Sequence, residues 1–351
     1  MDLKKAICYY GDDSGKTFFC GRRWMLNLDL SPDVFCHNMH YAGGGFEGIR
    51  GMWDEKEREL YLITLPEHLQ RLSRTSNFMG LMPIDTVSLA ERTMQLVANN
   101  VHSGFLDPTK GCYIRHLIYK DRKLGESGEQ EPGLGVYSGG HKKVMTISLF
   151  PWGAYLESTN VRVFEQGIDS PLRQHKCVAN YGFNGLAKNT AVDNGFDEAL
   201  ITDTTPDRNV LEGGGENVFI FGDGEIITPS TDQAILPGTK RQITMEIIRA
   251  YGGTVEERKI PLDEFMTAPA AAFTGTAAGF IGIQSVFNPL TEREQTFDPN
   301  HPIVGDITVE SLAEIYQNVV SGKEVDPRLQ ELQRRIRTPV NLEARLKKLR
   351  T

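Results

Sequence analysis

Three consecutive glycines in the stretch VLEGGGENVFIF, residues 210–221, constrain the fold of this chain more than any other feature. Glu212 and Glu216 flank the glycines, and the apolar segment 217–221 that follows is typical of a strand. The glycine-rich loops of dinucleotide-binding and P-loop folds lead into a helix instead, because the N–H groups of the helix N-terminus face the phosphate. The Lys-Ser/Thr pair of a P-loop is also missing. The order of residues therefore disfavours both nucleotide-binding folds.

Glycines that precede a strand allow another part of the molecule to approach the backbone closely, and they permit unusual backbone angles. One interpretation of this stretch is that a bulky group packs against the glycines, with Glu212 placed to touch it. The other is a tight turn between two solvated acids. Taken alone the stretch favours the turn, so other segments must decide.

Composition disfavours several classes of protein. The chain of 351 residues is long enough for one large domain or two moderate ones. Its formal net charge of −8 disfavours a nucleic-acid partner, since phosphate backbones bind clustered positive charge. Five cysteines without a CxxC pair disfavour a disulfide framework or a zinc site and indicate a reducing compartment. Since neither a signal peptide nor a membrane-spanning run is evident, we expect a cytoplasmic protein with no metal and no membrane partner.

Hydrophobic periodicity predicts an α+β protein of two domains. We expect a small N-terminal domain at 1–154, a linker at 155–163, a larger domain at 164–325 and a C-terminal helical extension at 326–351. In the first domain the pattern predicts strands at 59–65, 112–119 and 143–150, a helix that begins at Pro66, and a mobile loop over 122–143. In the second it predicts strands at 161–166, 198–203, 217–221 and 224–229, and helices at 184–195, 238–253 and 309–322.

Three further segments would make sense around one anionic, electron-withdrawing cofactor. The stretch LPGTKR at 236–241 begins the clearest predicted helix, whose N-terminus attracts anions, although a plain helix start explains it equally well. Thr276 in FTGTAAGF, 273–280, could bind a phosphate or carboxylate, or the stretch could be a close-packed strand. In HKCVANYG, 175–182, apolar neighbours would lower the pKa of Lys176 and permit a Schiff base, although most lysines are simply solvated.

Together these segments resemble the class IV (fold-type IV) enzymes that use pyridoxal 5′-phosphate, and most closely the branched-chain amino-acid aminotransferases. The resemblance runs from about residue 38 to residue 320. It rests on an ordered set of motifs: HYAGGGFEGIRGM (40–52), EHLQRL (67–72), YIR (113–115), FPWGAYL (150–156), KCVANYG (176–182), DEALITD (197–203), LEGGGENVF (211–219), ILPGTKR (235–241) and TGTAA (274–278). It implies a two-domain fold, with a small N-terminal α/β domain and a larger C-terminal pseudo-barrel α/β domain.

The resemblance implies a cofactor site. Lys176 would hold pyridoxal 5′-phosphate as a Schiff base and later move a proton between the substrate Cα and C4′ of the cofactor. Tyr181 would hydrogen-bond the phenolic oxygen, and Glu212 would keep the pyridine nitrogen protonated, so that the ring accepts electrons. On this interpretation the glycines let the backbone pass close to the ring, whereas Glu216 bonds nearby backbone. The phosphate would be bound by Arg71, Gly238, Thr239, Lys240 and Thr276.

The resemblance also implies a substrate site and an oligomer. Arg115 suits the distal carboxylate of glutamate, because a guanidinium binds a carboxylate through two parallel hydrogen bonds. The substrate α-carboxylate would lie near Tyr113, Arg115, Thr276 and Ala277. The apolar pocket would be walled by Tyr41, Phe46, Trp152 and Tyr155. Residues of the small domain would complete the site of a neighbouring subunit, so we expect a homo-oligomer, a dimer or larger.

The expected activity is transfer of the amino group of Leu, Ile or Val to 2-oxoglutarate. Alternatives within the same fold are a D-amino-acid aminotransferase, an aminodeoxychorismate-lyase-type enzyme and a specialised-pathway transaminase. A non-catalytic protein that binds a nucleotide or another phosphate at 237–241 is an alternative of a different class. The sequence departs from the family pattern at Lys240, where threonine is usual, and at His116, where proline is common. Neither departure removes a catalytic group, and both bear on substrate preference.

Overall fold

The structure is a computed structural model, and it describes residues 8–12, 17–20, 33–125, 129–151, 159–165, 171–222 and 224–350. The chain forms two compact units, each discontinuous in sequence. The first unit comprises Met1–Gly153, His175–Ala179 and Ile336–Thr351, and the second comprises Ala154–Gln174 and Asn180–Arg335. The domain ranges expected from the sequence are continuous, whereas two short pieces, 175–179 and 336–351, here group with the N-terminal part of the chain.

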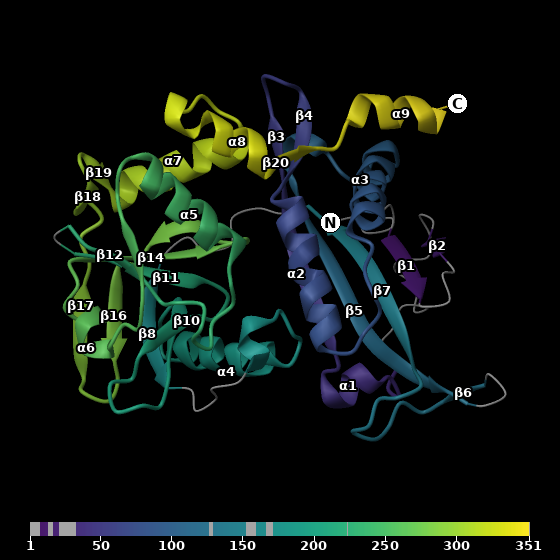
Figure 1. Ribbon diagram of the computed structural model, residues 1–351, viewed down its shortest axis with the longest axis horizontal. Helices are drawn as coiled ribbons and strands as arrows, with labels where there is room; N and C mark the ends of the chain where they lie inside the picture. Colours follow the sequence, from purple (N-terminus) through teal and green to yellow (C-terminus); the bar gives the residue numbers. More distant parts are fainter. Residues whose placement is uncertain are drawn as a thin grey trace. The chain divides into compact units, whose positions relative to one another are not determined.

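An antiparallel sheet forms the centre of the first unit, in the order β2-β1-β7-β5-β3-β4-β20, with β6 beside β5 (Figure 1). Its strands are β1 (Cys8–Asp12), β2 (Thr17–Cys20), β3 (Gly44–Asp54), β4 (Glu59–Ile63), β5 (Cys112–Leu124), β6 (Gln130–Glu131), β7 (His141–Phe150) and β20 (Arg337–Pro339). The three predicted strands are confirmed. The predicted loop over 122–143 is wrong at both ends, because β5 continues to Leu124, pairs with β6 and is followed by β7 from His141.

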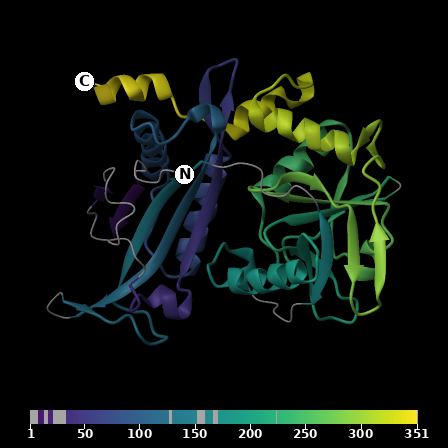
Figure 2. The same ribbon diagram turned by 180° about the vertical axis from the view of Figure 1, so that it is seen from behind.

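Two helices pack on this sheet and bury one apolar stripe each. The helices of the first unit are α1 (His37–Tyr41), α2 (Leu65–Phe78), α3 (Thr86–His102) and α9 (Leu342–Arg350), with a short 3-10 turn, η2, at Pro108–Lys110. Leu69 and Leu72 of α2 and Leu96 of α3 are fully buried in one cluster with strand residues such as Ile49 and Ile114. Figure 2, the view from behind, shows α2 lying along the strands of the sheet. The predicted helix after Pro66 is confirmed.

The C-terminal segment adds a strand to the first unit, so the predicted helical extension is only partly helical. β20 pairs with β4, and Arg337 Nη2 lies 2.5 Å from Asp54 Oδ2 on β3. Farther on, α9 is joined to α3, because the Arg345 guanidinium donates to both carboxylate oxygens of Glu91, at 2.6 and 2.7 Å. Strand pairing and two ion pairs therefore attach the end of the chain to this sheet.

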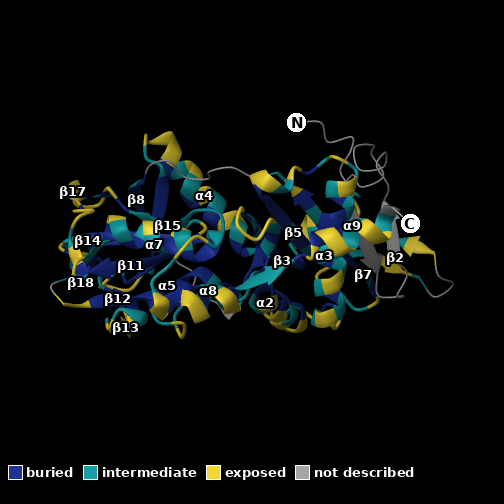
Figure 3. Ribbon diagram, turned by 90° about the horizontal axis from the view of Figure 1, so that it is seen from above, coloured by how far each residue is buried: buried dark blue, intermediate teal, exposed yellow. Residues whose placement is uncertain are grey.

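The second unit contains two five-stranded sheets, in the orders β10-β9-β8-β16-β17 and β13-β12-β11-β14-β15, and a two-stranded β18-β19 pair. Side chains of both large sheets share one buried cluster that includes Val163, Leu200, Val218 and Phe273, so the sheets pack face to face. All five residues of the central strand β11 are buried (Figure 3). The strands are β8 (Asn160–Glu165), β9 (Glu198–Thr202), β10 (Val210–Gly213), β11 (Asn217–Phe221), β12 (Ile226–Thr228), β13 (Val255–Glu257), β14 (Ala270–Gly275), β15 (Gly279–Gly282), β16 (Ser285–Asn288), β17 (Arg293–Thr296), β18 (Pro302–Val304) and β19 (Ile307–Thr308).

Helices connect parallel strand pairs in the second unit. α4 joins β8 to β9 and α5 joins β12 to β13, the usual crossover for parallel neighbours. The helices are α4 (Asn180–Asp193), α5 (Thr239–Ala250), α6 (Leu262–Phe265), α7 (Val309–Ser321) and α8 (Gln330–Ile336), with 3-10 turns η3 (Pro171–Gln174) and η4 (Pro327–Leu329). The predicted helix ends near Gly195, Gly252 and Gly322 are confirmed, and all three glycines have positive φ.

The described part of the chain contains no helix that is long and apolar enough to cross a membrane. The same residues include no group of three or more His, Cys, Asp or Glu side chains that could hold a metal ion.

Candidate active site

Hydrogen bonds on both sides fix the backbone that carries Lys176 within the first unit. The Lys176 carbonyl accepts from the Phe46 N–H of β3 at 3.0 Å, and the Lys176 N–H donates to Thr75 Oγ1 of α2 at 3.2 Å. The Val178 N–H donates to the Gly44 carbonyl at 2.9 Å. A Cβ atom at Gly45 would lie 2.5 Å from Thr75 Cγ2, so only glycine leaves room for this approach.

The Lys176 amine lies against an aromatic ring. Its Nζ is 4.8 Å from the centre of the Phe46 ring, a cation–π distance when the amine is charged. Burial, followed by the positive charge of Arg71, lowers the pKa of Lys176 to about 8, while the Glu47 carboxylate opposes the change. An amine with this pKa is neutral in a much larger fraction of molecules than an ordinary lysine. It can therefore act as a nucleophile or a base near neutral pH.

A guanidinium from β5 lies over the same ring and donates to a phenol of its own strand. The Cζ atom of Arg115 is 4.5 Å from the centre of the Phe46 ring, and Arg115 Nη2 donates to the Tyr113 hydroxyl at 3.0 Å. A Cβ atom at Gly48, opposite Arg115 on β3, would lie 1.8 Å from that hydroxyl, so the glycine makes space for Tyr113. The buried Nε of Arg115 has no hydrogen-bond partner among the described residues. This donor is available to a ligand carboxylate.

Arg71 lies in a buried ion pair that the sequence did not predict. Its Nε donates to Glu47 Oε1 at 2.6 Å and its Nη2 donates to Glu47 Oε2 at 3.0 Å. Glu47 Oε2 also lies 2.7 Å from His68 Nδ1. Burial opposes the ionisation of Glu47, but Arg71 and His68 outweigh it and hold the pKa of Glu47 well below its usual range. A carboxylate therefore fixes one edge of the guanidinium.

The other predicted wall residues differ in their placement. Tyr41 ends α1, is exposed, and accepts from the Gly135 N–H at 3.0 Å through its hydroxyl oxygen. Trp152 and Tyr155 lie outside the described residues.

In the second unit, Glu212 accepts hydrogen bonds from a guanidinium and from a backbone N–H. Arg173 Nη2 donates to Glu212 Oε1 at 3.0 Å, and the Leu236 N–H donates to Glu212 Oε2 at 3.0 Å. Arg173 is itself buried, and its Nη1 donates to Asn184 Oδ1 of α4 at 2.7 Å. The guanidinium compensates the buried carboxylate and favours its ionised form. A fixed anion of this kind can hold a proton on a ring nitrogen.

The three glycines after Glu212 permit close packing, not unusual backbone angles. None of them has a positive φ. A Cβ atom at Gly213 would lie 2.9 Å from Glu216 Oε2, and one at Gly214 would lie 2.6 Å from Glu198 Oε1, whereas one at Gly215 would meet no atom of the described residues within 4 Å. Two of the glycines therefore allow a close neighbour, while the approach of the cofactor ring stays a prediction. The groups that approach are buried carboxylates.

Glu216 is a second buried acid in this region, and it bonds to backbone as predicted. Its Oε2 accepts from the Gly215 N–H at 2.9 Å. Burial, followed by the charge of Glu198, raises the pKa of Glu216 to about 8. Glu198 in turn pairs with Lys188, whose Nζ lies 2.8 Å from its Oε2. Glu216 thus holds a proton near neutral pH, while Glu198 has its own cation.

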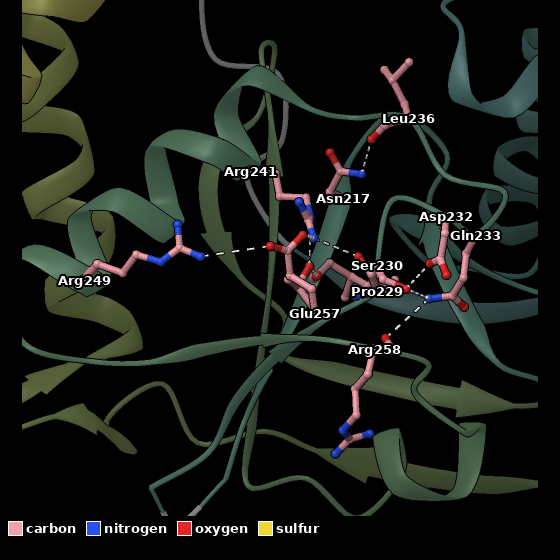
Figure 4. Close-up of polar contacts among 12 residues, drawn as sticks. Asn217, Pro229, Ser230, Asp232, Gln233, Leu236, Arg241, Arg249, Glu257 and Arg258 are labelled. Atoms are coloured by element: carbon pink, nitrogen blue, oxygen red, sulfur yellow. Dashed lines mark hydrogen bonds and ion pairs between the residues drawn. The ribbon is translucent and has the colours of Figure 1, made fainter.

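The start of α5 is anchored by side chains that face the protein interior (Figure 4). Arg241 Nη2 donates to Glu257 Oε2 at 2.6 Å and to the Pro229 carbonyl at 2.9 Å. Asn217 Nδ2 donates to the Leu236 carbonyl at 2.8 Å, so the Leu236 residue links Asn217 to Glu212. A Cβ atom at Gly238 would lie 1.9 Å from Asn217 Oδ1, which explains the glycine at the N-cap.

The remaining predicted residues of the second unit lie at element ends. Thr239 is the first residue of α5, and Lys240, the departure from the family pattern, is buried and does not face solvent. Thr276 and Ala277 lie in the turn between β14 and β15, and Tyr181 is the second residue of α4. All three are partly buried.

Sequence reasoning missed Glu47 and Arg173. The signal for Glu47 was present, because a single acid in the otherwise apolar stretch GGFEGI of a buried strand requires a partner. Arg173 gave no such signal. Its partner is 39 residues away in sequence, and only the fold brings the two together.

The family follows from comparison with known proteins. Residues 44–286 match the amino-transferase class IV family. The chain is 30% identical over 299 residues to the probable branched-chain-amino-acid aminotransferase of Aquifex aeolicus, covering 83% of this chain and 88% of that protein. This chain belongs to the class IV aminotransferases. It is a transaminase similar to the branched-chain enzymes.

Solved structures of the family share the fold over nearly the whole chain. A branched-chain aminotransferase from Thermoproteus uzoniensis, crystallised with norvaline, superposes with a TM-score of 0.76 at 25% identity, covering 95% of this chain and 100% of that one. The T.th. branched-chain amino acid aminotransferase, complexed with N-(5′-phosphopyridoxyl)-L-glutamate, gives a TM-score of 0.72 at 22% identity, covering 96% and 99%. The predicted two-domain fold-type IV architecture is confirmed.

Proposed function

We propose that this class IV aminotransferase moves the amino group of L-leucine, L-isoleucine or L-valine to 2-oxoglutarate, with pyridoxal 5′-phosphate bound at Lys176. One observation carries the proposal. The Lys176 amine, with its lowered pKa, lies over Phe46 beside Arg115, whose buried Nε has no partner among the described residues. A reactive amine and a carboxylate receptor on one apolar wall suit an amino acid that has an aliphatic side chain.

Two features of the described residues fit the cofactor. Lys176 supplies an amine for its aldehyde, and Glu212, paired with Arg173, would supply a carboxylate for its ring nitrogen. When bound, the cofactor supplies a pyridine ring that accepts electrons from the substrate Cα. Tyr181 would bind its phenolic oxygen. Its phosphate would be bound by Arg71, Gly238, Thr239, Lys240 and Thr276.

The chain's own residues would bind and orient the substrate. Arg115, oriented by Tyr113, would bind the distal carboxylate of 2-oxoglutarate. The substrate α-carboxylate would lie near Tyr113, Arg115, Thr276 and Ala277. The Nζ of Lys176 would take a proton from the substrate Cα and then donate it to C4′ of the cofactor. Tyr41, Phe46, Trp152 and Tyr155 would enclose the aliphatic side chain and exclude water.

The amino group can leave as glutamate, since the T.th. relative binds a phosphopyridoxyl-glutamate adduct. We infer in addition a cytoplasmic homo-oligomer, a dimer or larger. Two segments of the first unit, 33–41 and 133–137, expose large apolar side chains. A hydrogen bond joins the two segments, because the Gly133 N–H donates to the Phe35 carbonyl at 2.8 Å. The exposed side chains are Val34, Phe35, Met39, Tyr41, Leu134, Val136 and Tyr137. A second copy of the chain would cover them.

A panel of amino donors with 2-oxoglutarate, followed by glutamate formation, tests the reaction. We expect turnover with L-leucine, L-isoleucine and L-valine, and none with their D-enantiomers. A preference for aromatic or D-amino donors would overturn the substrate assignment. Replacing Lys176→Ala should abolish turnover while the far-UV circular dichroism spectrum stays unchanged.

The assembly can be measured independently. We expect sedimentation equilibrium of the holoenzyme to give at least twice the chain mass of 39.2 kDa. A fully active monomer would exclude the oligomer and leave the reaction in place.

A further inference from the structure

Glu47 is a buried carboxylate to which the proposed reaction gives no role. It follows Phe46 on β3, it is fully buried, and each of its two oxygens accepts a hydrogen bond from Arg71. Both bonds use the Nε–Nη2 edge of the guanidinium, which fixes the plane of that group as well as its position. His68 Nδ1, at 2.7 Å, is a third donor to the same carboxylate.

The residues bound to Glu47 share a helix face with the residue that holds Lys176. His68, Arg71 and Thr75 are spaced by three and four along α2, so they lie on one face. Thr75 Oγ1 accepts from the Lys176 N–H, and the Phe46 N–H, one residue before Glu47, donates to the Lys176 carbonyl. Glu47 therefore joins the strand and the helix between which the Lys176 backbone is bonded.

Glu47 also balances charge next to Lys176. The groups that act on the pKa of Lys176 are Arg71 from α2, Glu47 from β3, and Tyr113 and Arg115 from β5. Arg71 lowers that pKa and Glu47 raises it. Without the carboxylate, the effect of Arg71 would lose the stronger of the two groups that oppose it, since Tyr113 also raises that pKa.

His116 lies opposite Glu47 on β5 and does not contribute a competing charge. Burial lowers the pKa of His116 to about 4. The Thr93 hydroxyl donates to the Leu89 carbonyl at 2.7 Å, so its contact with His116 Nε2 at 2.8 Å requires that the imidazole donate. His116 is thus a neutral ring, and the cations at Glu47 come from α2.

We propose that Glu47 is a positioning residue for cofactor capture: it holds the Arg71 guanidinium in one orientation for the cofactor phosphate. This inference rests on the proposed function, in which Arg71 binds that phosphate. It assigns no direct contact between Glu47 and the cofactor. The carboxylate acts through Arg71 and through the local charge at Lys176.

The test compares two ligands on the apoprotein: pyridoxal 5′-phosphate and pyridoxal, which lacks the phosphate. The variant is Glu47→Gln, which keeps the shape of the side chain. The matched control is Asp54→Asn, because Asp54 is a buried carboxylate on the same strand, paired with Arg337 and not with Arg71. The quantity compared is the affinity for pyridoxal 5′-phosphate divided by the affinity for pyridoxal. We expect Glu47→Gln to lower this affinity ratio by about tenfold or more, and Asp54→Asn to leave it within about twofold of the wild-type value.

A second measurement follows the charge of Lys176. The apoprotein should form an imine with pyridoxal, which borohydride traps by reduction. The rate of imine formation should rise with pH through the pKa of Lys176. In Glu47→Gln the midpoint should move to lower pH, since an attraction for the ammonium form is lost. Glu47→Asp keeps the charge with a shorter reach. Glu47→Asp should keep the midpoint of the pH profile and still lose the preference for pyridoxal 5′-phosphate over pyridoxal. This second variant tests the proposal if Glu47→Gln does not fold.

The outcomes separate the two levels of inference. Wild-type protein that forms no adduct at Lys176 overturns the proposed function and this inference with it. Wild-type protein that forms the adduct, with unchanged phosphate discrimination in both Glu47 variants, overturns the role of Glu47 alone. In an Arg71→Ala background the Glu47→Gln change should no longer alter the affinity ratio. A persistent effect there would show that Glu47 does not act through Arg71.

Discussion

Glu47 in the first unit and Glu216 in the second are both buried glutamates, yet their pKa values move in opposite directions. Glu47 has three hydrogen-bond donors from Arg71 and His68, and its pKa lies well below the usual range. Glu216 accepts from one backbone N–H and lies near the charge of Glu198, and its pKa is raised to about 8. Burial is the largest single influence on both, and it favours the protonated form in each.

The comparison shows that the partners of a buried acid decide its charge. A carboxylate that meets a guanidinium stays ionised, because the paired charges offset the loss of hydration. A carboxylate that meets another carboxylate takes up a proton. In the second unit, Arg173 supplies the cation for Glu212 and Lys188 the cation for Glu198, while Glu216 keeps a proton.

The largest expected effect concerns stability. The same substitution, Glu to Gln, should change the free energy of unfolding differently at Glu47 and at Glu216. Glu47→Gln should lower the free energy of unfolding at pH 7 by about 3–5 kcal/mol, because it leaves Arg71 buried without its counter-charge. Glu216→Gln should leave that free energy unchanged or raise it, because the wild-type side chain is already neutral in the folded state. Urea unfolding at pH 7 measures both. Equal losses in the two variants would show that their charge states do not differ.

Arg173→Met should lower kcat/KM by about a hundredfold, because it leaves Glu212 buried without its cation and favours the protonated carboxyl. Glu212 would then resemble Glu216. Steady-state kinetics measures the loss, with Lys188→Met as the control, since Lys188 pairs with Glu198 and not with Glu212. Equal activity of the Arg173 variant and the wild type would mean that the pairing is structural only.

The glycines of the second unit should differ in their tolerance of a methyl group. Gly214→Ala should lower the free energy of unfolding by about 1–3 kcal/mol, because its Cβ would lie 2.6 Å from Glu198 Oε1. Gly215→Ala meets nothing within 4 Å and should change stability by less than about 0.5 kcal/mol. Thermal unfolding of the two variants side by side distinguishes them. Similar losses at both positions would place the carboxylate of Glu198 elsewhere.

The smallest effect is a pH dependence. The folded-state pKa of Glu216, about 8, lies above its ordinary value, so its protonation stabilises the fold at low pH and this contribution is lost as the pH rises toward 8. The stability of Glu216→Gln relative to the wild type should therefore grow by about 1 kcal/mol from pH 6 to pH 7. Urea unfolding at each pH gives the difference. A constant difference would mean that Glu216 is ionised in the folded state.

Much of the local structure could be predicted from the sequence, because hydrophobic periodicity and the positions of proline and glycine are local signals. The helix after Pro66 and the helix ends at Gly195, Gly252 and Gly322 follow from these signals. The predicted loop over 122–143 failed, because β5 and β7 extend into it through pairing with each other and with β6, and polar residues are tolerated at such a sheet end. Pairing depends on a distant partner, which a local pattern does not contain.

The sequence by itself determined the chemical groups and the family: a lysine next to apolar residues, an acid before three glycines, and the YIR motif with its guanidinium. Only the tertiary structure decided the state of those groups. It paired Arg71 with Glu47 and Arg173 with Glu212, and it left Glu216 beside another acid. The physical reason is that ionisation in a protein interior depends on distance to other charges, and residues far apart in sequence set those distances.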